Sequence, residues 1–234
     1  MLDESPQKLK NNEKLKRFLE YHVVSPMIKT RDLKEEMLTS IDAEHDQLRV
    51  NLYSTMPSFA NIMNRATINC ARVIHFDQET CGSVFHQVDS VLAVPEMNIL
   101  EMLRTNPRYS QFYKLVMKAN LSSLLEEANE NGFTVLVPND DIFNELNDWI
   151  KEKKEAGEID DLVKNHIVAG VKCCAGIVRS QWPFVNSFKT ISNNHLNTNR
   201  DRRPRIQNAA VTKCDLTAKN GIIHEINDVI NVET

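Results

Sequence analysis

Histidine, cysteine and acidic side chains are the residues of this chain that could do chemistry, and their spacing argues against catalysis. His75, Asp77 and Glu79 could be imagined as metal ligands, but the same segment is typical of the polar tip of a hairpin. The sequence has no His-Glu-x-x-His pair, no Cys-x-x-Cys pair, no glycine-rich phosphate loop and no Gly-x-Ser-x-Gly elbow. We therefore expect a protein that is not an enzyme, with no catalytic residue, no metal and no cofactor.

Four histidines recur at matched positions in the two halves of the chain. Residues 18–24 (FLEYHVV) return as residues 162–168 (LVKNHIV), which relates His22 to His166 by a shift of 144 (166 − 22). The same shift takes Ile62 to Ile206, Asn64 to Asn208, Ala66 to Ala210 and Cys70 to Cys214. The next pair, His86 and His224, is separated by 138 (224 − 86). We therefore expect an ungapped register from His22 to Cys70 and a six-residue insertion between Cys70 and His86.

Each of these histidines has a functional and a structural interpretation. A histidine within an apolar segment is more often a buried residue with satisfied ring nitrogens than a ligand. We expect His86, His166 and His224 to be structural for this reason.

Composition limits the function classes further. The chain has 234 residues with 41% hydrophobic and 26% charged residues, enough for one large or two ordinary packed domains. A formal net charge of −4 gives no overall attraction to nucleic acid or to anionic lipid. No apolar run approaches the roughly 20 residues of a membrane helix, and residues 1–16 contain no apolar signal-peptide core. We expect no nucleic-acid partner and no membrane span in this chain.

The elements that position these residues follow from the hydrophobic pattern. Residues 8–24 have a helical period, whereas residues 48–53, 66–76 and 84–94 are strand candidates. A second unit begins near Met97 with helical spacing over residues 112–119 and 121–128, followed by a buried strand at 133–137. Pro138 ends that strand, and Asn139 or Asp140 can cap the next helix. Grouped helices with short strands predict an α+β fold.

Three stretches of the second unit together resemble the fasciclin domain. They are FTVLVPNDDIFNEL, NHIVAG and NGIIHEINDVI, in the order and at the spacing of that family's motifs. The resemblance implies an α+β module in which short strands form a wedge or sandwich and several helices pack against it. In the first unit, YHVV and HQVDSVLAVP resemble only the back half of such a module, with Ser83 where the family and Gly221 have glycine. We expect residues 1–95 to be a partial, C-terminal-half domain and residues 96–234 a complete one, in a tandem piece of a longer protein.

The family resemblance implies contact residues for adhesion. The family's Tyr-His segment is linked to integrin binding, and it carries over to Tyr21 and His22, whereas the second unit has Asn165 in place of the tyrosine. A second integrin-linked motif carries over to Asp215 and Leu216. The alternative for Tyr21 and His22 is that they simply pack the end of their helix.

Two surface features are readable from residue type alone. Arg200, Arg202, Arg203 and Arg205 form the densest cluster of positive charge, which could bind a heparin-like polyanion or be no more than a solvated loop. Asn120 begins the sequon Asn-Leu-Ser and is the candidate glycosylation site.

The five cysteines predict one disulfide in each unit. We expect Cys70 to pair with Cys81 across a local hairpin, and Cys214 to pair with Cys173 or Cys174. Only geometry decides the connectivity.

The resemblance therefore implies an extracellular adhesion or matrix-interaction module, secreted or at the cell surface. Its partners would be a cell-surface receptor such as an integrin, other fasciclin modules or matrix components, including a heparin-like polyanion. Two alternatives remain: a small metal-dependent hydrolase, and an intracellular scaffold if the missing signal sequence is genuine.

Overall fold

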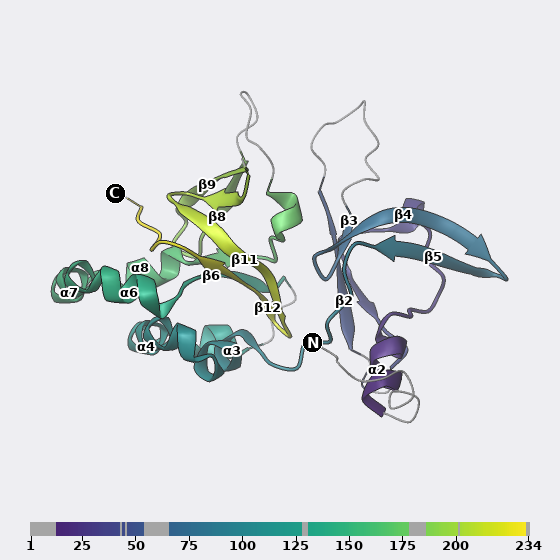
Figure 1. Ribbon diagram of the computed structural model, residues 1–234, viewed down its shortest axis with the longest axis horizontal. Helices are drawn as coiled ribbons and strands as arrows, with labels where there is room; N and C mark the ends of the chain where they lie inside the picture. The colour runs from purple at the N-terminus through teal and green to yellow at the C-terminus, as the bar shows by residue number, and fades with distance from the viewer. Residues whose placement is uncertain are drawn as a thin grey trace. The chain divides into compact units, whose positions relative to one another are not determined.

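The chain folds into two compact units, Met1–Val94 and Pro95–Thr234 (Figure 1). The structure, a computed structural model, describes residues 13–42, 44, 46–53, 66–127, 131–177, 186–200 and 202–232. Both units combine helices with a β-sheet, so the predicted α+β class is confirmed.

The first unit is a short helix on an antiparallel sheet. Its elements are α2 (Glu13–Tyr21), η1 (Thr30–Asp32), β1 (Met37–Thr39), β2 (Gln47–Leu52), β3 (Ala66–Ile68), β4 (Ala71–Thr80) and β5 (Ser83–Val88). The strands lie in the order β1-β2-β3-β4-β5, and each neighbouring pair is antiparallel. Its buried cluster contains Tyr21, Leu48, Ala71 and Leu92. The expected helix over residues 8–24 is α2, although residues 8–12 lie outside the described part of the chain.

The second unit contains more helices and a larger sheet. Its helices are α3 (Ile99–Thr105), η3 (Pro107–Tyr109), α4 (Ser110–Lys118), α5 (Ser122–Glu126), α6 (Asp140–Glu145), α7 (Asn147–Glu155), α8 (Ile159–Asn165) and η4 (Cys174–Gly176). Its strands are β6 (Phe133–Pro138), β7 (Ile167–Ala169), β8 (Asn186–Lys189), β9 (His195–Arg200), β10 (Pro204–Ile206), β11 (Ala209–Ala218) and β12 (Gly221–Ile226). They are ordered β7-β6-β12-β11-β10-β9-β8.

Strand β6 forms the centre of the second unit. It pairs in parallel with β12 and antiparallel with β7, and all six of its residues are buried. Alternate residues of a strand point to opposite faces, so Phe133, Val135 and Val137 join the cluster formed with the helices, while Leu136 joins a second cluster. Helices α3, α4, α6 and α8 border this part of the sheet in Figure 1. The apolar run at 133–137 is therefore a strand covered on both faces.

Local chemistry fixes the ends of these elements. Asn139 begins α6 and accepts hydrogen bonds from the backbone N–H groups of Asp141 and Ile142. Gly132, which precedes β6, has φ +64°. Gly221 lies directly against β6, where an added Cβ would be 2.1 Å from the Phe133 carbonyl oxygen. Glycine at position 221 is thus what allows β6 and β12 to approach each other.

The strand pairing corrects the predicted register of the repeat. Thr67 pairs with Arg72 and Arg205 with Ala210, which relates β3–β4 to β10–β11 by a shift of 138 (205 − 67) rather than 144. The ungapped register is wrong because the connection from β2 to β3 is longer than the connection from β9 to β10. The length difference is therefore already present before Ala66, and Cys70 and Cys214 are not equivalent. Ile62 and Asn64 lie outside the described residues.

Candidate functional site

Two histidines make the same hydrogen bonds in the two units. The Nδ1 atoms of His22 and His166 lie 2.8 Å from the carbonyl oxygens of Phe18 and Leu162, each one helical turn earlier. The backbone N–H groups of Leu92 and Ile230 donate to the respective Nε2 atoms, at 3.2 and 3.0 Å. Both rings are therefore neutral tautomers with the proton on Nδ1, and each joins a helix end to the last segment of its unit.

The other two histidines each support a bulge in the long hairpin of their unit. Asp77 and Asp215 have φ of +50° and +58° in the irregular parts of β4 and β11. The Asp215 backbone N–H donates to His224 Nδ1 at 3.0 Å, and the matching Asp77–His86 distance is 3.5 Å. Each aspartate carboxylate in turn accepts a backbone N–H at 2.9 Å, from Thr30 or from Cys174. The bulge, the aspartate and the histidine therefore form one structural unit that occurs twice.

Burial keeps two of these rings neutral. His166 is 1% exposed, and its burial lowers its pKa to about 4. Burial also lowers the pKa of His224, against the opposing effect of Asp215. Both ring nitrogens of each histidine are hydrogen-bonded within the unit, which agrees with the predicted structural role.

Tyr21 does not lie on the surface. Its side chain is fully buried, and its hydroxyl donates to the Gln47 carbonyl oxygen at 3.1 Å and accepts from Asn69 Nδ2. The same burial raises the pKa of Tyr21 to about 12. The expected contact role is therefore wrong for Tyr21, because its ring packs the end of α2. His22 is exposed, but both of its ring nitrogens are hydrogen-bonded within the unit.

Asp215 and Leu216 also serve the fold. The Asp215 side chain is 21% exposed and holds the turn at Cys174, and Leu216 packs against the main cluster of the second unit. Neither side chain protrudes as the expected contact motif would. Both residues are half-buried and lie at the irregular part of β11.

Three of the four arginines in the predicted cluster are exposed. Arg202 and Arg203 are exposed on the turn from β9 to β10, and Arg205 is exposed on β10; we call these three residues the arginine turn. Arg205 donates to the Asn208 carbonyl oxygen at 2.6 Å, whereas Arg200 is half-buried and its Nη1 lies 3.4 Å from the Ile177 carbonyl oxygen. Within the described residues, none of these arginines forms an ion pair with a carboxylate. Their charge is therefore available to an anion.

Asn120 occupies an accessible corner between two helices. It lies between α4 and α5 with φ +52°, and its side chain is exposed. The geometry leaves room for a glycan at this sequon.

The cysteines pair differently from the expectation in the first unit. In the second unit Cys174 and Cys214 form a disulfide with a Cα–Cα distance of 5.9 Å, which is one of the two expected pairings. In the first unit Cys81 is free and exposed at the tip of the β4–β5 hairpin. Cys70 and Cys81 lie at opposite ends of the ten-residue strand β4, about 30 Å apart at roughly 3.3 Å per residue. A Cys70–Cys81 bridge is therefore excluded, since a disulfide needs Cα atoms within about 7 Å.

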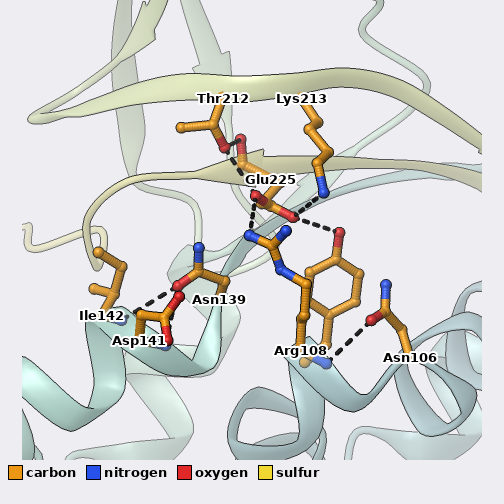
Figure 2. Close-up of polar contacts among 9 residues, drawn as sticks. Asn106, Arg108, Asn139, Asp141, Ile142, Thr212, Lys213 and Glu225 are labelled. Carbon is orange, nitrogen blue, oxygen red and sulfur yellow. Dashed lines mark hydrogen bonds and ion pairs between the residues drawn. The ribbon is translucent and has the colours of Figure 1, made fainter.

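A buried charged residue in β12 was not among the predicted sites. Glu225 is 2% exposed and accepts hydrogen bonds from Tyr109 and Lys213 at 2.9 and 3.1 Å. Arg108 binds its other oxygen at 3.0 Å, and Thr212 lies beside it (Figure 2). This cluster fastens η3 to the β11–β12 hairpin. The signal in the sequence was a glutamate where the resembled motif has valine.

The surroundings of Glu225 keep it ionised. Burial acts to raise its pKa, but the hydrogen bonds from Lys213 and Tyr109 outweigh burial, so the pKa of Glu225 is lowered. Burial, followed by the neighbouring carboxylate, raises the pKa of Tyr109. The cluster contains a charged acceptor whose bonds are satisfied, which describes a structural clamp rather than a general acid.

One group of side chains in the second unit has the composition of a metal site. Ligand atoms of Cys174, Asp215 and His224 lie within 4.8 Å of one another. The Cys174 sulfur is bonded to Cys214, and the two His224 nitrogens bond the Asp215 N–H and the Lys172 carbonyl oxygen. These donor atoms are already used, so the residues do not fit a metal.

A model of the fasciclin domain matches residues 1–95 and 107–232. The chain belongs to the fasciclin domain family. Its paired histidines and bulges are thus features of two fasciclin units, and the predicted resemblance is confirmed.

Curated relatives include adhesion-type fasciclin proteins. The chain is 26% identical to human periostin over 226 residues, which is 94% of this chain and 25% of periostin. It is 24% identical to the pig transforming growth factor-beta-induced protein ig-h3 over 94% of this chain and 30% of that protein. Mouse stabilin-2 is 26% identical over 66% of this chain and 6% of its own length. The chain therefore spans about a quarter to a third of the first two relatives.

A solved structure shares the fold. It is a fasciclin domain pair from the insect cell adhesion molecule fasciclin I, with a TM-score of 0.53, 19% identity and coverage of 94% of this chain and 80% of that one. Among the described residues, no helix is long and apolar enough to cross a membrane.

Proposed function

We propose that this chain is a non-enzymatic adhesion module that binds matrix or cell-surface partners outside the cell. The observation that carries the proposal is the match of both units to the fasciclin domain. Adhesion requires rigid units with accessible surface rather than a cleft with reacting groups. The buried histidines and Glu225 serve such rigidity, because their polar atoms are bonded within their own units.

Two alternatives are less well supported. A metal-dependent hydrolase needs ligand atoms that are free to bind, and the Cys174, Asp215 and His224 group offers none. An intracellular scaffold would work in a reducing compartment, where structural disulfides are rare. The Cys174–Cys214 disulfide favours an oxidising, extracellular environment.

The arginine turn is the surface that we propose for matrix contact. It presents Arg202, Arg203 and Arg205 without carboxylate partners among the described residues. Guanidinium groups bind sulfate and carboxylate in a planar, two-point manner, and a cluster of them suits a heparin-like polyanion. Tyr21 and Asp215 are not proposed as contacts, since one is buried and the other holds the bulge.

Salt elution from heparin tests this surface. Replacing Arg202, Arg203 and Arg205 with glutamine should lower the salt concentration of elution markedly. With fewer cations on the protein, binding displaces fewer counterions from the polyanion. The matched control replaces the exposed Lys114, Lys118 and Lys151 with glutamine, which changes the net charge equally. Equal elution of the two triple variants would reject the arginine turn as the polyanion site.

Cell attachment tests the adhesion function itself. Cells should attach to a surface coated with the chain and not to one coated with the heat-unfolded chain. If soluble heparin and the arginine variant both abolish attachment, the partner is a cell-surface polyanion. If attachment persists under both conditions, the partner is a protein receptor such as an integrin or another fasciclin module. An absence of attachment would contradict the proposed function.

A further inference from the structure

A hollow of about 480 Å³ opens in the second unit between α7–α8, the β8–β9 turn and the final segment. It is lined by Lys153, Glu158, Asp161, Leu162, Asn165, Ser192, Asn194, Ile230, Asn231 and Val232. Its size is in the range of small-molecule sites, which run from about 300 to 1,000 Å³. The lining combines an aliphatic floor with amide, hydroxyl and carboxylate groups.

The equivalent place in the first unit is filled and bridged. Tyr21 occupies the end of α2 with a fully buried ring. One turn earlier, the Arg17 guanidinium reaches from α2 to the β1–β2 turn and binds Asp46 at 2.6 Å. Glu44 binds the same guanidinium at 2.8 Å. Helix and turn are thereby held together.

Three replacements remove this filling in the second unit. The shift of 144 fixed by the matched histidines places Asp161 where Arg17 is, and Asn165 where Tyr21 is. The residue before β9 is Asn194, and the residue before β2 is Asp46. The two residues of the cross-link are thus replaced by an aspartate and an asparagine, and the ring by a short side chain. The hollow follows from these substitutions.

One amide group that lines the hollow has no acceptor among the described residues. Asn165 is only 7% exposed, and its Oδ1 accepts from Ser192 Oγ at 2.5 Å and from Asn194 Nδ2 at 2.8 Å. No described residue accepts a hydrogen bond from Asn165 Nδ2. Asn165 Nδ2 is therefore an N–H donor that is open to the hollow, and a ligand there can accept from it.

The chemistry of the lining selects the ligand. The ligand must accept from Asn165 Nδ2, which ammonium and guanidinium groups cannot do. An anion can accept, but the lining offers it no unpaired cation, because Lys153 is paired with Glu158 at 2.6 Å, and Asp161 adds a carboxylate that is 3.8 Å from Lys164. A neutral hydroxyl accepts from an amide and donates to a carboxylate at the same time. A sugar ring offers several such hydroxyls and an aliphatic C–H face for Leu162, Ile230 and Val232.

We propose that this hollow is a binding site for one unit of a neutral saccharide. The ring would lie on the aliphatic floor, accept from Asn165 Nδ2 and donate to Asp161. The site is separate from the arginine turn, so it adds a second, uncharged kind of glycan contact. Failure at one site leaves the other intact.

The test is a titration of the full, ¹⁵N-labelled chain followed by NMR. The probes are methyl α-mannoside, methyl β-galactoside and methyl β-N-acetylglucosaminide, with glucuronate as an anionic probe and glycerol as an acyclic polyol. At least one methyl glycoside should shift the Asn165 side-chain amide signals saturably, with a dissociation constant of about 1 mM, as expected for a ligand of this size. Glucuronate and glycerol should bind at least tenfold more weakly.

Two variants install the residues of the first unit. Asp161→Arg replaces an acceptor whose side chain is 78% exposed, so the fold is retained, and Asn165→Tyr refills the hollow. Each should weaken binding of the glycoside at least tenfold. The matched controls Asp148→Arg and Asn147→Tyr alter exposed residues of α7 outside the lining and should bind normally. Absence of a saturable shift with all three glycosides, unchanged binding in Asp161→Arg, or equal binding of glucuronate would each overturn the proposal.

Discussion

At the scale of single residues, the repeat preserves hydrogen bonds rather than residue types. His22 and His166 make matching bonds although one is exposed and the other buried. The adjacent residues, Tyr21 and Asn165, differ in size and perform different tasks. The histidines therefore fix the backbone of each helix end, and the neighbouring position is free to vary between filling and binding.

The buried His166 makes stability depend on pH. Its folded pKa of about 4 is below the unfolded value of about 6.5, so the unfolded chain binds the extra proton between these values. The contribution of His166 to the stability of the second unit is therefore fully present above pH 6.5 and is lost as the pH drops toward 4, which amounts to up to about 3 kcal/mol. Urea unfolding at pH 7, 5.5 and 4.5 measures this loss.

His166→Gln should make the pH dependence shallower, since glutamine does not titrate, while His224, whose pKa burial also lowers, keeps part of the slope. The control His195→Gln removes an exposed histidine and should keep the wild-type slope. If the stability of His166→Gln falls with pH as steeply as that of the wild type, the assignment to His166 is incorrect.

The roles of the histidines could be predicted from residue type, but the role of Tyr21 depends on which side of its helix faces the core. A histidine in an apolar pattern already indicates a satisfied ring. Tyr21 lies on a helical pattern that also contains the exposed Leu19 and Val23, so the sequence does not tell which side faces the core. Glu225 is a similar case, because its partners Arg108 and Tyr109 are more than 100 residues away. A local sequence pattern carries no information about partners that are so distant in the chain.

At the scale of elements, the equivalent strands β5 and β12 have different environments. Strand β12 is paired on both sides, by β11 and β6, and all six of its residues are buried. Strand β5 pairs with β4 and is the last strand of its sheet among the described residues. Phe85, the counterpart of the fully buried Ile223, is 56% exposed. The alternating pattern of β5 and the continuous burial of β12 express this difference.

Hydrogen exchange should report the open edge of β5. Its outward backbone N–H groups have no ladder partner among the described residues, so they should exchange about 100-fold faster than those of β4 in the same unit. The corresponding groups of β12 should be protected to the level of β11. Equal protection across β4 and β5, measured by NMR, would show that a further segment covers this edge.

Gly221 and Ser83 are the equivalent first residues of β12 and β5, and they show the same contrast between a strand paired on both sides and an edge strand. Gly221→Ser would place a Cβ 2.1 Å from the Phe133 carbonyl oxygen and should destabilise the second unit by about 3 kcal/mol in urea. The reciprocal change, Ser83→Gly, should change the stability of the first unit by less than about 1 kcal/mol, because Ser83 is exposed. A tolerated Gly221→Ser would mean that β6 and β12 are not in this register.

The register error shows where sequence patterns stop being informative. Identical residues at a shift of 144 suggested that Cys70 and Cys214 match, but hydrogen-bond pairing relates Thr67 to Arg205. The loops differ in length between the units, and residues that are identical by chance at the shift of 144 concealed this difference. Equivalent positions in the two units are defined by strand pairing rather than by identical residues. The bounds of β4 also place Cys70 and Cys81 at its opposite ends.

At the scale of the whole molecule, the two units differ in core size. The second unit has two buried clusters, one on each face of β6, whereas the described cluster of the first unit contains Tyr21, Leu48, Ala71 and Leu92. Buried apolar area is the main stabilising contribution to folding, at roughly 25 cal/mol per Å². The first unit should therefore be the less stable of the two.

Thermal unfolding should consequently occur in two steps that different probes separate. Both tryptophans of the chain, Trp149 and Trp182, belong to the second unit, so tryptophan fluorescence follows that unit alone. Circular dichroism follows the strands of both. Heating should produce a first circular-dichroism transition without a fluorescence change, and then a second transition seen by both probes. Residues 95–234 expressed alone should show only the second transition, at a similar temperature. Coincident transitions in the full chain would instead mean that the two units unfold as one cooperative body.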